Sequence, residues 1–439
     1  MAAPSRCGRS TRRMAEAPTT SDHNSVDRVV DHLFRHTAGD IVAVLTRIFG
    51  IDRLAMVEDV VQDALIAALK NWPYNGIPDN PGGWLITAAR NRALDLIRRE
   101  KSLAEKQPDI ARQLYHSLQD TISDRDPHGL ADDQLRLMFA CCHPSLPADS
   151  RVMIVLKLLC GFSVAEIARA FLSSEAAVAQ RIVRAKRTLR EHDEQFMNLE
   201  HKEITSRLDS VLQALYLMFN EGYSVTEGEN LVRFDLVGEA LRLSAAVAAH
   251  EAGARPDVFA LIALMSLQAA RLPARVDADG NLVLLADQDR ARWDRQLIAR
   301  GMHYLERAAD GERVTRYHLE AGIAACHMAA PSYEKTDWEQ ILAYYELLAQ
   351  QDSSPVIMLN RAVAVAELRG AERGLEELDR LAGEPKLEGY YLYHATRAEL
   401  LTRLGQSTNA LDSYRTALSL TGSAPERRFL EQRIADHTA

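Results

Sequence analysis

The chain has 439 residues, of which 47% are hydrophobic and 26% are charged, and its formal net charge is −9. These are ordinary values for a folded protein of two to four domains. No apolar run reaches the roughly 18 residues that span a bilayer, and the five irregularly spaced cysteines suit a reducing compartment, so we expect a cytoplasmic protein without membrane contact.

The N-terminal part predicts a tail followed by a helical bundle. Residues 1–25 carry basic residues but no apolar segment of a secretory signal, so we expect a disordered tail in which either Met1 or Met14 is the start. Residues 26–101 show the periodicity of a helical bundle, and the polar, aperiodic residues 102–130 predict a linker.

Within the bundle, two predicted helices flank a loop. Helical periodicity predicts one helix over residues 58–72, with an acidic first turn, and a second, basic helix over residues 84–100. Residues 73–83 between them contain three prolines and three glycines, so we expect no regular element there.

Residues 149–191, inside a domain predicted over 131–195, have the pattern of three helices with two short breaks. Ser163 and Glu166 form an S-x-x-E capping box that starts the second helix, and a four-residue break precedes a third helix from Glu175. One apolar stripe runs along this third helix, at Val178, Ile182, Ala185 and Leu189. The basic residues lie mostly off that stripe. The pattern is typical of a helix-turn-helix, whose last helix enters the DNA major groove; the alternative is an ordinary helix pair with a solvated basic face.

The second half of the chain predicts an all-helical extension, as residues 196–330 and then residues 331–439. Residues 271–294 are the exception, where an Asp-Gly step suggests a turn or small hairpin. Residues 354–381 and 389–418 superpose with glycines 35 positions apart, close to the tetratricopeptide pattern. Two copies leave ordinary helical hairpins of similar length as the alternative.

Charge is divided unevenly between the two halves. Residues 1–195 hold 26 Lys and Arg against 25 Asp and Glu, whereas residues 196–439 hold 26 against 36. The acidity therefore belongs to the extension. In the first half, positive charge is concentrated in two helices, and charge concentrated on one face indicates nucleic-acid binding better than the total does.

No residues suggest catalysis or a cofactor. A glycine-rich phosphate loop, a nucleophile elbow and an H-E-x-x-H motif are all missing from the sequence, so we expect no enzyme activity. Cys141, Cys142, His143 and Cys160 contain no C-x-x-C pair, so we expect buried core thiols rather than a zinc site.

Together these residues carry a family resemblance. The string from Glu58 to Asp63, followed by Trp72, Trp84, Ala89-Arg90-Asn91 and Arg98-Arg99, resembles region 2 of the sigma-70 family, in its extracytoplasmic-function group. The stretch from Gly161 through Glu166-Ile167-Ala168 to Arg184-Ala185 resembles region 4 of the same group. The second half is similar to a long helical extension in one subgroup, through residues 219–224, 275–294, 336–341 and 359–370.

The resemblance implies a subunit that binds core RNA polymerase, through its clamp helices and flap tip, and directs it to promoter DNA. The implied polymerase-binding residues are Asp59, Gln62 and Asp63. The residues implied for the −10 element are Asn75, Asn80, Trp84, Arg90, Asn91 and Arg98. For Trp84, packing at a helix start is an equal alternative. The residues implied for the −35 element are Ser174, Glu175, Ala177, Gln180, Arg181, Arg184 and Arg187.

We therefore expect an all-α sigma factor regulated through its extension. The extension is expected to pack on the DNA-binding domains in the free protein, where its acidity would compete with promoter phosphates for the basic helices. The alternative is a polymerase-independent helix-turn-helix regulator with a ligand- or protein-sensing repeat domain. A second alternative is a repeat scaffold whose helix-turn-helix has lost its function.

Overall fold

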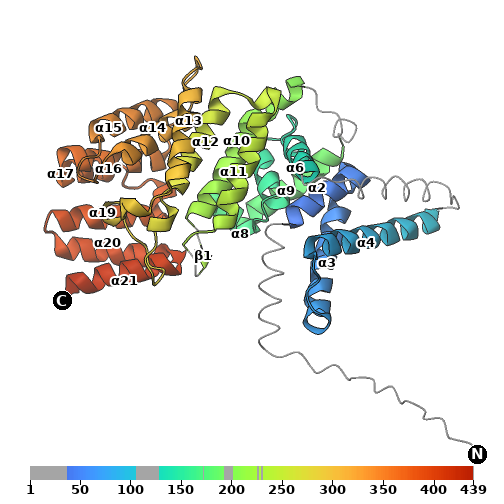
Figure 1. Ribbon diagram of the computed structural model, residues 1–439. Helices are drawn as coiled ribbons and strands as arrows, with labels where there is room; N and C mark the ends of the chain where they lie inside the picture. The colour runs from blue at the N-terminus through green and yellow to red at the C-terminus, as the bar shows by residue number, and fades with distance from the viewer. Residues whose placement is uncertain are drawn as a thin grey trace, which may run out of the picture. The chain divides into compact units, whose positions relative to one another are not determined.

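The computed structural model describes residues 37–104, 128–171, 173–191, 201–224, 227–228 and 231–438. The predicted tail, the start of the predicted bundle and most of the predicted linker lie outside these residues. The chain divides into two compact units, Met1–Gln134 and Leu135–Ala439. Nearly every described element is a helix, which confirms the predicted all-α class (Figure 1).

The first unit is built around one long helix. Helices α2 (Ala38–Phe49) and α4 (Pro81–Ala104) both pack against α3 (Leu54–Asn75). One face of α3 is buried, at Val57, Val60, Val61, Ala64, Leu65 and Ala68, which recur at helical spacing. Trp72 is buried near the end of this face, with its ring edge-on to Trp84 at 5.5 Å between centroids.

The predicted bounds of the loop, residues 73–83, are wrong at both ends. Helix α3 continues through Pro73 to Asn75, and α4 already begins at Pro81. A proline in the last turn removes a single backbone donor, and one at the first position of a helix replaces a donor that would have no helical partner. Asn80 precedes α4 and its side-chain oxygen accepts from the Gly83 amide at 2.9 Å, so it caps the helix.

The second unit contains the predicted three-helix pattern near its start. Helix α6 (His128–Cys141) leads into it, followed by α7 (Ala148–Leu158), α8 (Val164–Ala170) and α9 (Glu175–Arg190). Helices α7, α8 and α9 pack against one another in all three pairs.

The extension is a succession of packed helices. Its first part contains α10 (His201–Tyr223), α11 (Phe234–Ala249), α12 (Pro256–Ala269) and α13 (Arg295–Ala308). Its second part contains α14 (Arg316–Ala329), α15 (Trp338–Gln351), α16 (Pro355–Arg369), α17 (Ala371–Asp379), the short α18 (Pro385–Glu388), α19 (Tyr391–Arg403), α20 (Ser407–Leu420) and α21 (Ala424–Thr438). Figure 1 shows these helices stacked in layers from α10 to α21.

The repeat predicted from the sequence corresponds to two helical hairpins. Gly370 separates α16 from α17 and Gly405 separates α19 from α20, with φ of 96° and 72°. Positive φ is the reason that glycine stands at each turn. Whether the hairpins are tetratricopeptide repeats stays a prediction.

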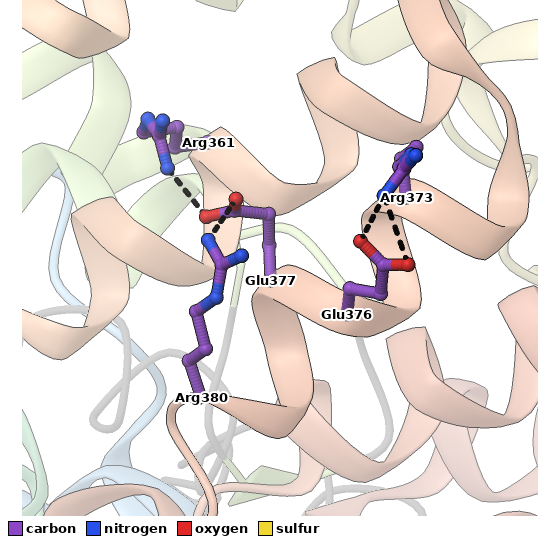
Figure 2. A network of polar contacts seen from close by, with 5 residues as sticks. All are labelled: Arg361, Arg373, Glu376, Glu377 and Arg380. Carbon is purple, nitrogen blue, oxygen red and sulfur yellow. Dashed lines mark hydrogen bonds and ion pairs between the residues drawn. The ribbon is translucent and has the colours of Figure 1, made fainter.

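Ion pairs add to the packing of α16 on α17 (Figure 2). The carboxylate of Glu377 accepts from Arg361 at 2.6 Å and from Arg380 at 2.5 Å. Arg361 comes from the neighbouring helix and both partners of that pair are largely buried, so this contact joins the two helices of the hairpin. Arg373 and Glu376 form an exposed pair on α17, one turn apart.

Residues 270–294, called here the connecting segment, join α12 to α13 and include the predicted turn. Val276 and Leu282 form an antiparallel bridge around a turn in which Gly280 has φ 78°. The short helical turns η4 (Leu272–Ala274), η5 (Leu285–Asp287) and η6 (Arg290–Arg292) complete the segment.

The connecting segment contacts both ends of the extension. Arg275 is buried, donates to the Tyr223 carbonyl at the end of α10 at 2.7 Å, and lies 3.9 Å from the ring centroid of the same tyrosine. Arg428 from α21 donates to the Asn281 side chain at 3.0 Å. Nearby, β1 (Glu227–Gly228) pairs in parallel with β2 (Gly422–Ser423). The first and last parts of the extension are therefore joined.

One helical stretch departs from the expectation that no run is apolar enough to span a bilayer. Among the described residues, Pro256–Ala274 passes by length and composition, with a mean hydropathy of 1.3 over its window. However, 83% of that window is buried inside the unit, where α12 packs against α10, α11, α13 and α14. Core packing therefore accounts for its apolar character.

Candidate nucleic-acid interface

The turn from α7 into α8 has the local structure that the sequence predicts. Gly161 takes a φ of 68° after the end of α7. The Ser163 amide donates to the Glu166 carboxylate at 2.6 Å, and the Glu166 amide donates to the Ser163 hydroxyl oxygen at 3.1 Å. Because α8 has only seven residues, these two capping bonds satisfy a large share of its unpaired donors.

Helix α9 begins at its predicted cap and buries its predicted stripe. The Ser174 hydroxyl oxygen accepts from the Ala177 amide at 3.3 Å. The buried side chains of α9 are Val178, Ile182, Ala185 and Leu189. All but one of the residues implied for the −35 element are exposed: Ser174, Glu175, Gln180, Arg181, Arg184 and Arg187. Ala177 is half-buried. Helix α9 therefore presents a basic, solvent-facing surface opposite its stripe.

Only weak contacts hold the arginines of this surface. The Arg181 guanidinium lies 3.5 Å from the Asp149 carboxylate, and the two side chains are 43% and 57% exposed. Arg184 donates to the Gln180 side-chain oxygen at 3.3 Å. Exposed contacts of this kind contribute ~0–1 kcal/mol, so phosphates or base edges can replace them. Asp149 was not predicted, because it belongs to α7 and only the packing of α7 on α9 brings it near.

In the first unit, the residues implied to bind polymerase share one exposed face of α3. Asp59, Gln62 and Asp63 are all exposed, and Ile66, 48% exposed, continues the same face one turn later. Asp63 pairs with Arg92 of α4 at 3.1 Å, and both side chains are about half exposed. Further exposed apolar side chains follow at Leu69, Tyr74 and Ile77. None of these apolar residues was predicted as part of a site.

The residues implied for the −10 element lie between the end of α3 and the middle of α4. Asn75 and Asn80 are exposed on either side of residues 76–79. Along α4, Trp84, Asn91 and Arg98 are seven residues apart and so share a face. Trp84 is half-buried against Trp72, as the packing alternative predicts, and part of its ring is accessible.

Two arginines on α4 have local partners. Arg90 lies beside Asn91, with 3.5 Å between its guanidinium and the amide oxygen. Arg98 pairs with Asp95 at 3.6 Å, with both side chains more than half exposed. Like the contacts on α9, these are surface contacts of small energy.

The cysteines near the helix-turn-helix are core thiols. Cys141, Cys142 and Cys160 are buried. Burial raises the pKa of Cys142 to about 12 and raises that of Cys160 further, which keeps both thiols protonated. No group of three metal-ligating side chains occurs among the residues that the structure describes.

The extension contacts the helix-turn-helix away from the basic surface of α9. Arg207 of α10 is 2% exposed and donates to the Phe139 carbonyl of α6 at 3.1 Å. Arg151 of α7 reaches the Ser210 hydroxyl at 3.5 Å. Arg233 lies 3.4 Å from the Glu166 carboxylate, which belongs to the capping box. The extension therefore leaves the basic surface of α9 exposed, so the expected competition with promoter phosphates does not occur at this helix.

Comparison with known proteins gives three family matches. The family described as Sigma-70 region 2 matches residues 33–103, and Sigma-70, region 4 matches residues 136–189. A family of unknown function, DUF6596, matches residues 207–309, which hold most of α10, all of α11 to α13 and the connecting segment. An uncharacterized protein of Rhizobium meliloti (strain 1021) is 39% identical over 387 residues, 88% of this chain and 90% of that protein. No solved structure matches the chain.

Proposed function

We propose a role for each exposed face of this chain, which belongs to the sigma-70 family and acts in promoter recognition. It is a member of the extracytoplasmic-function type and has a C-terminal helical extension. The partners that follow from membership are core RNA polymerase and promoter DNA. We place the protein in the cytoplasm, where both partners are.

The exposed face of α3 is the polymerase-binding surface. Asp59, Gln62, Asp63 and Ile66 occupy successive turns on one side of the helix. A row of polar side chains that continues into an exposed isoleucine suits a protein partner, because interfaces combine an apolar centre with a polar rim. The ion pair between Asp63 and Arg92 is exposed, so its loss on binding costs little.

The α3–α4 connection and the neighbouring face of α4 hold the opened strand of the −10 element. Residues 76–80 are irregular and exposed, apart from a half-buried Pro78, and irregular backbone can offer groups to a flipped base. Arg90 and Arg98 then contact phosphates, and the accessible part of Trp84 stacks on a base.

Helix α9 reads the −35 element. Gln180 and Arg184 are exposed and in contact with each other, and Gln and Arg are the side chains that recognise adenine and guanine through two hydrogen bonds. Ala176, Ala177 and Ala179 leave few long side chains at the N-terminal end of the helix, so DNA shape contributes to recognition there.

The extension regulates promoter recognition through its contact with α6, α7 and α8 rather than by covering α9. The single observation that supports this arrangement is the exposed basic surface of α9 in a unit whose acidic extension packs elsewhere. The α16–α17 and α19–α20 hairpins, which we propose to be tetratricopeptide-like repeats, would receive the regulatory signal.

Run-off transcription with purified core polymerase tests the proposal. The full chain is expected to direct initiation from one defined site, and Arg184→Ala is expected to reduce initiation on the −35 side. Arg415→Ala, an exposed arginine of the extension, is the matched control and should leave initiation unchanged. A chain that binds its DNA site tightly alone, does not co-purify with core polymerase and never supports initiation would instead be an independent regulator.

A further inference from the structure

A cavity of about 470 Å³ lies within the extension, apart from every surface assigned above to DNA or polymerase. Side chains of α15, α16, α19, α20 and α21 form its walls, and Leu282, Leu284 and Leu285 of the connecting segment line it as well. Pockets that bind small molecules have volumes of about 300–1,000 Å³, so the cavity is large enough for one.

The two principal walls are single faces of helices. Asn360, Val363, Ala364 and Glu367 line the cavity from α16 and recur at the spacing of one helical face. On α19, one helical face also lines the cavity, with Ala395, Thr396, Glu399 and Arg403. Rigid helices on both sides fix the shape of the cavity in the absence of a ligand.

Acidic groups outnumber basic groups in the lining. Glu367 and Arg403 contact each other through both carboxylate oxygens, at 2.8 and 3.2 Å, and so neutralise each other. Glu399 accepts one hydrogen bond, from the Tyr414 hydroxyl at 3.1 Å. Glu426 accepts from the hydroxyls of Tyr391 and Thr421.

The histidine of the lining does not offset these carboxylates. Burial, together with the nearby Arg271 and Arg290, lowers the pKa of His327 to about 4, so its ring is neutral at pH 7. Its Nδ1 is buried without a hydrogen-bond partner among the described residues. The net charge of the lining is therefore negative.

Aromatic rings complete the lining. Tyr333 and Trp338 lie edge to face, with ring centroids 5.3 Å apart, and Tyr345 also lines the cavity. Aromatic faces attract cations, more strongly where water is excluded. Apolar walls, aromatic rings and an excess of carboxylates in one partly open cavity favour a ligand with an apolar body and a positive charge.

We propose that this cavity binds a small organic cation, an aromatic or aliphatic amine whose ammonium group lies at Glu399 and whose apolar body contacts the connecting segment. The proposal depends only on the cavity and not on the role of the chain in transcription. Its test therefore needs no polymerase or DNA.

Isothermal titration of the full chain with three probes of nearly equal shape tests the proposal. Protonated tryptamine should bind about tenfold more tightly than the neutral alcohol tryptophol, and indoleacetate more weakly still. Glu399→Gln should remove the advantage of tryptamine while binding of tryptophol stays unchanged. Ala395→Phe should abolish binding of all three probes by filling the cavity. Glu372→Gln, an exposed glutamate on α17, is the control and should change nothing.

Several results would overturn the proposal. They are equal affinity for all three probes, preference for indoleacetate, no binding of any probe by the folded chain, and tryptamine binding that Glu399→Gln leaves intact. If an apolar basic peptide binds and the probes do not, the site is a protein-binding groove and the proposal is also wrong. Circular dichroism of each variant ensures that a loss of binding is not a loss of fold.

Discussion

Replacement of Arg207 by methionine tests whether the extension is held on the helix-turn-helix by the contact described above. Arg207 is 2% exposed, donates to the Phe139 carbonyl at 3.1 Å, and pairs with Glu203 at 3.0 Å. Methionine keeps most of the length and the apolar stem of the side chain but donates no hydrogen bond. The variant therefore removes the polar contact with little loss of packing.

The expected loss follows from the surroundings of the guanidinium. A hydrogen bond from a charged donor contributes ~1.5–3 kcal/mol, and in the variant the Phe139 carbonyl keeps only the Cys142 amide as a donor, at 3.2 Å. Burial opposes the charge of Arg207 and lowers its pKa, and removal of this desolvation cost offsets part of the loss. Glu203 is 28% exposed and can rehydrate, so its pair adds little. We expect a net loss of about 2 kcal/mol, which is roughly 30-fold in a local opening equilibrium.

Native-state hydrogen exchange of the full chain measures this loss. Amides in α6 and α10 should exchange roughly 30-fold faster in Arg207→Met, with no change in α19 and α20. Arg415→Met is the matched control, since Arg415 is 58% exposed and pairs with Asp412 one turn away. It should change exchange by less than about twofold. Unchanged protection of α6 and α10 in Arg207→Met, or an equal effect of the two substitutions, would refute the reasoning.

Three further predictions concern the basic surface and one buried histidine. Arg184→Ala should weaken promoter binding by ~1–3 kcal/mol and reduce the slope of the log binding constant against the log salt concentration by about one. Fluorescence anisotropy of the holoenzyme across a salt series measures both quantities, and an unchanged slope contradicts a role in DNA contact. Asp149→Asn should strengthen the same binding by up to about fivefold, because it removes the carboxylate that competes for Arg181, and weaker binding would count against that role. The pKa of His327 is lowered from 6.5 to about 4, so the unfolded chain binds more protons between these values and stability falls as pH falls. From pH 6.5 to pH 5 the free energy of unfolding falls by about 2 kcal/mol. In thermal unfolding, the stability of His327→Gln should therefore depend less on pH than that of the parent chain. An equal pH dependence in the two proteins would exclude this histidine as the cause.

Features decided by local spacing could be predicted from the sequence. The stripe of α9 and the capping box of α8 occur at the predicted residues, because helical periodicity and a three-residue separation determine both. The exposed position of Asp59, Gln62 and Asp63 likewise follows from their common face on α3.

Other features depend on contacts that local sequence does not encode. Asp149 approaches Arg181 across 32 residues, and Arg207 approaches Phe139 across 68, so only the packing of whole helices brings them together. The bounds of the α3–α4 connection were missed for a different reason. Proline usually breaks a helix, but Pro73 and Pro81 occupy positions where a helix tolerates them. Residues 275–294 stood out as a motif, but their place beside a cavity required the tertiary structure.

The contacts of Arg207 and Arg233 with α6 and α8 join parts of one polypeptide. Their formation is a unimolecular equilibrium, because the two surfaces belong to one chain and meet at an effective concentration set by the linker between them. Dilution or gene dosage leaves that equilibrium where it is. Each copy of the protein carries its contact partner at a ratio of one to one.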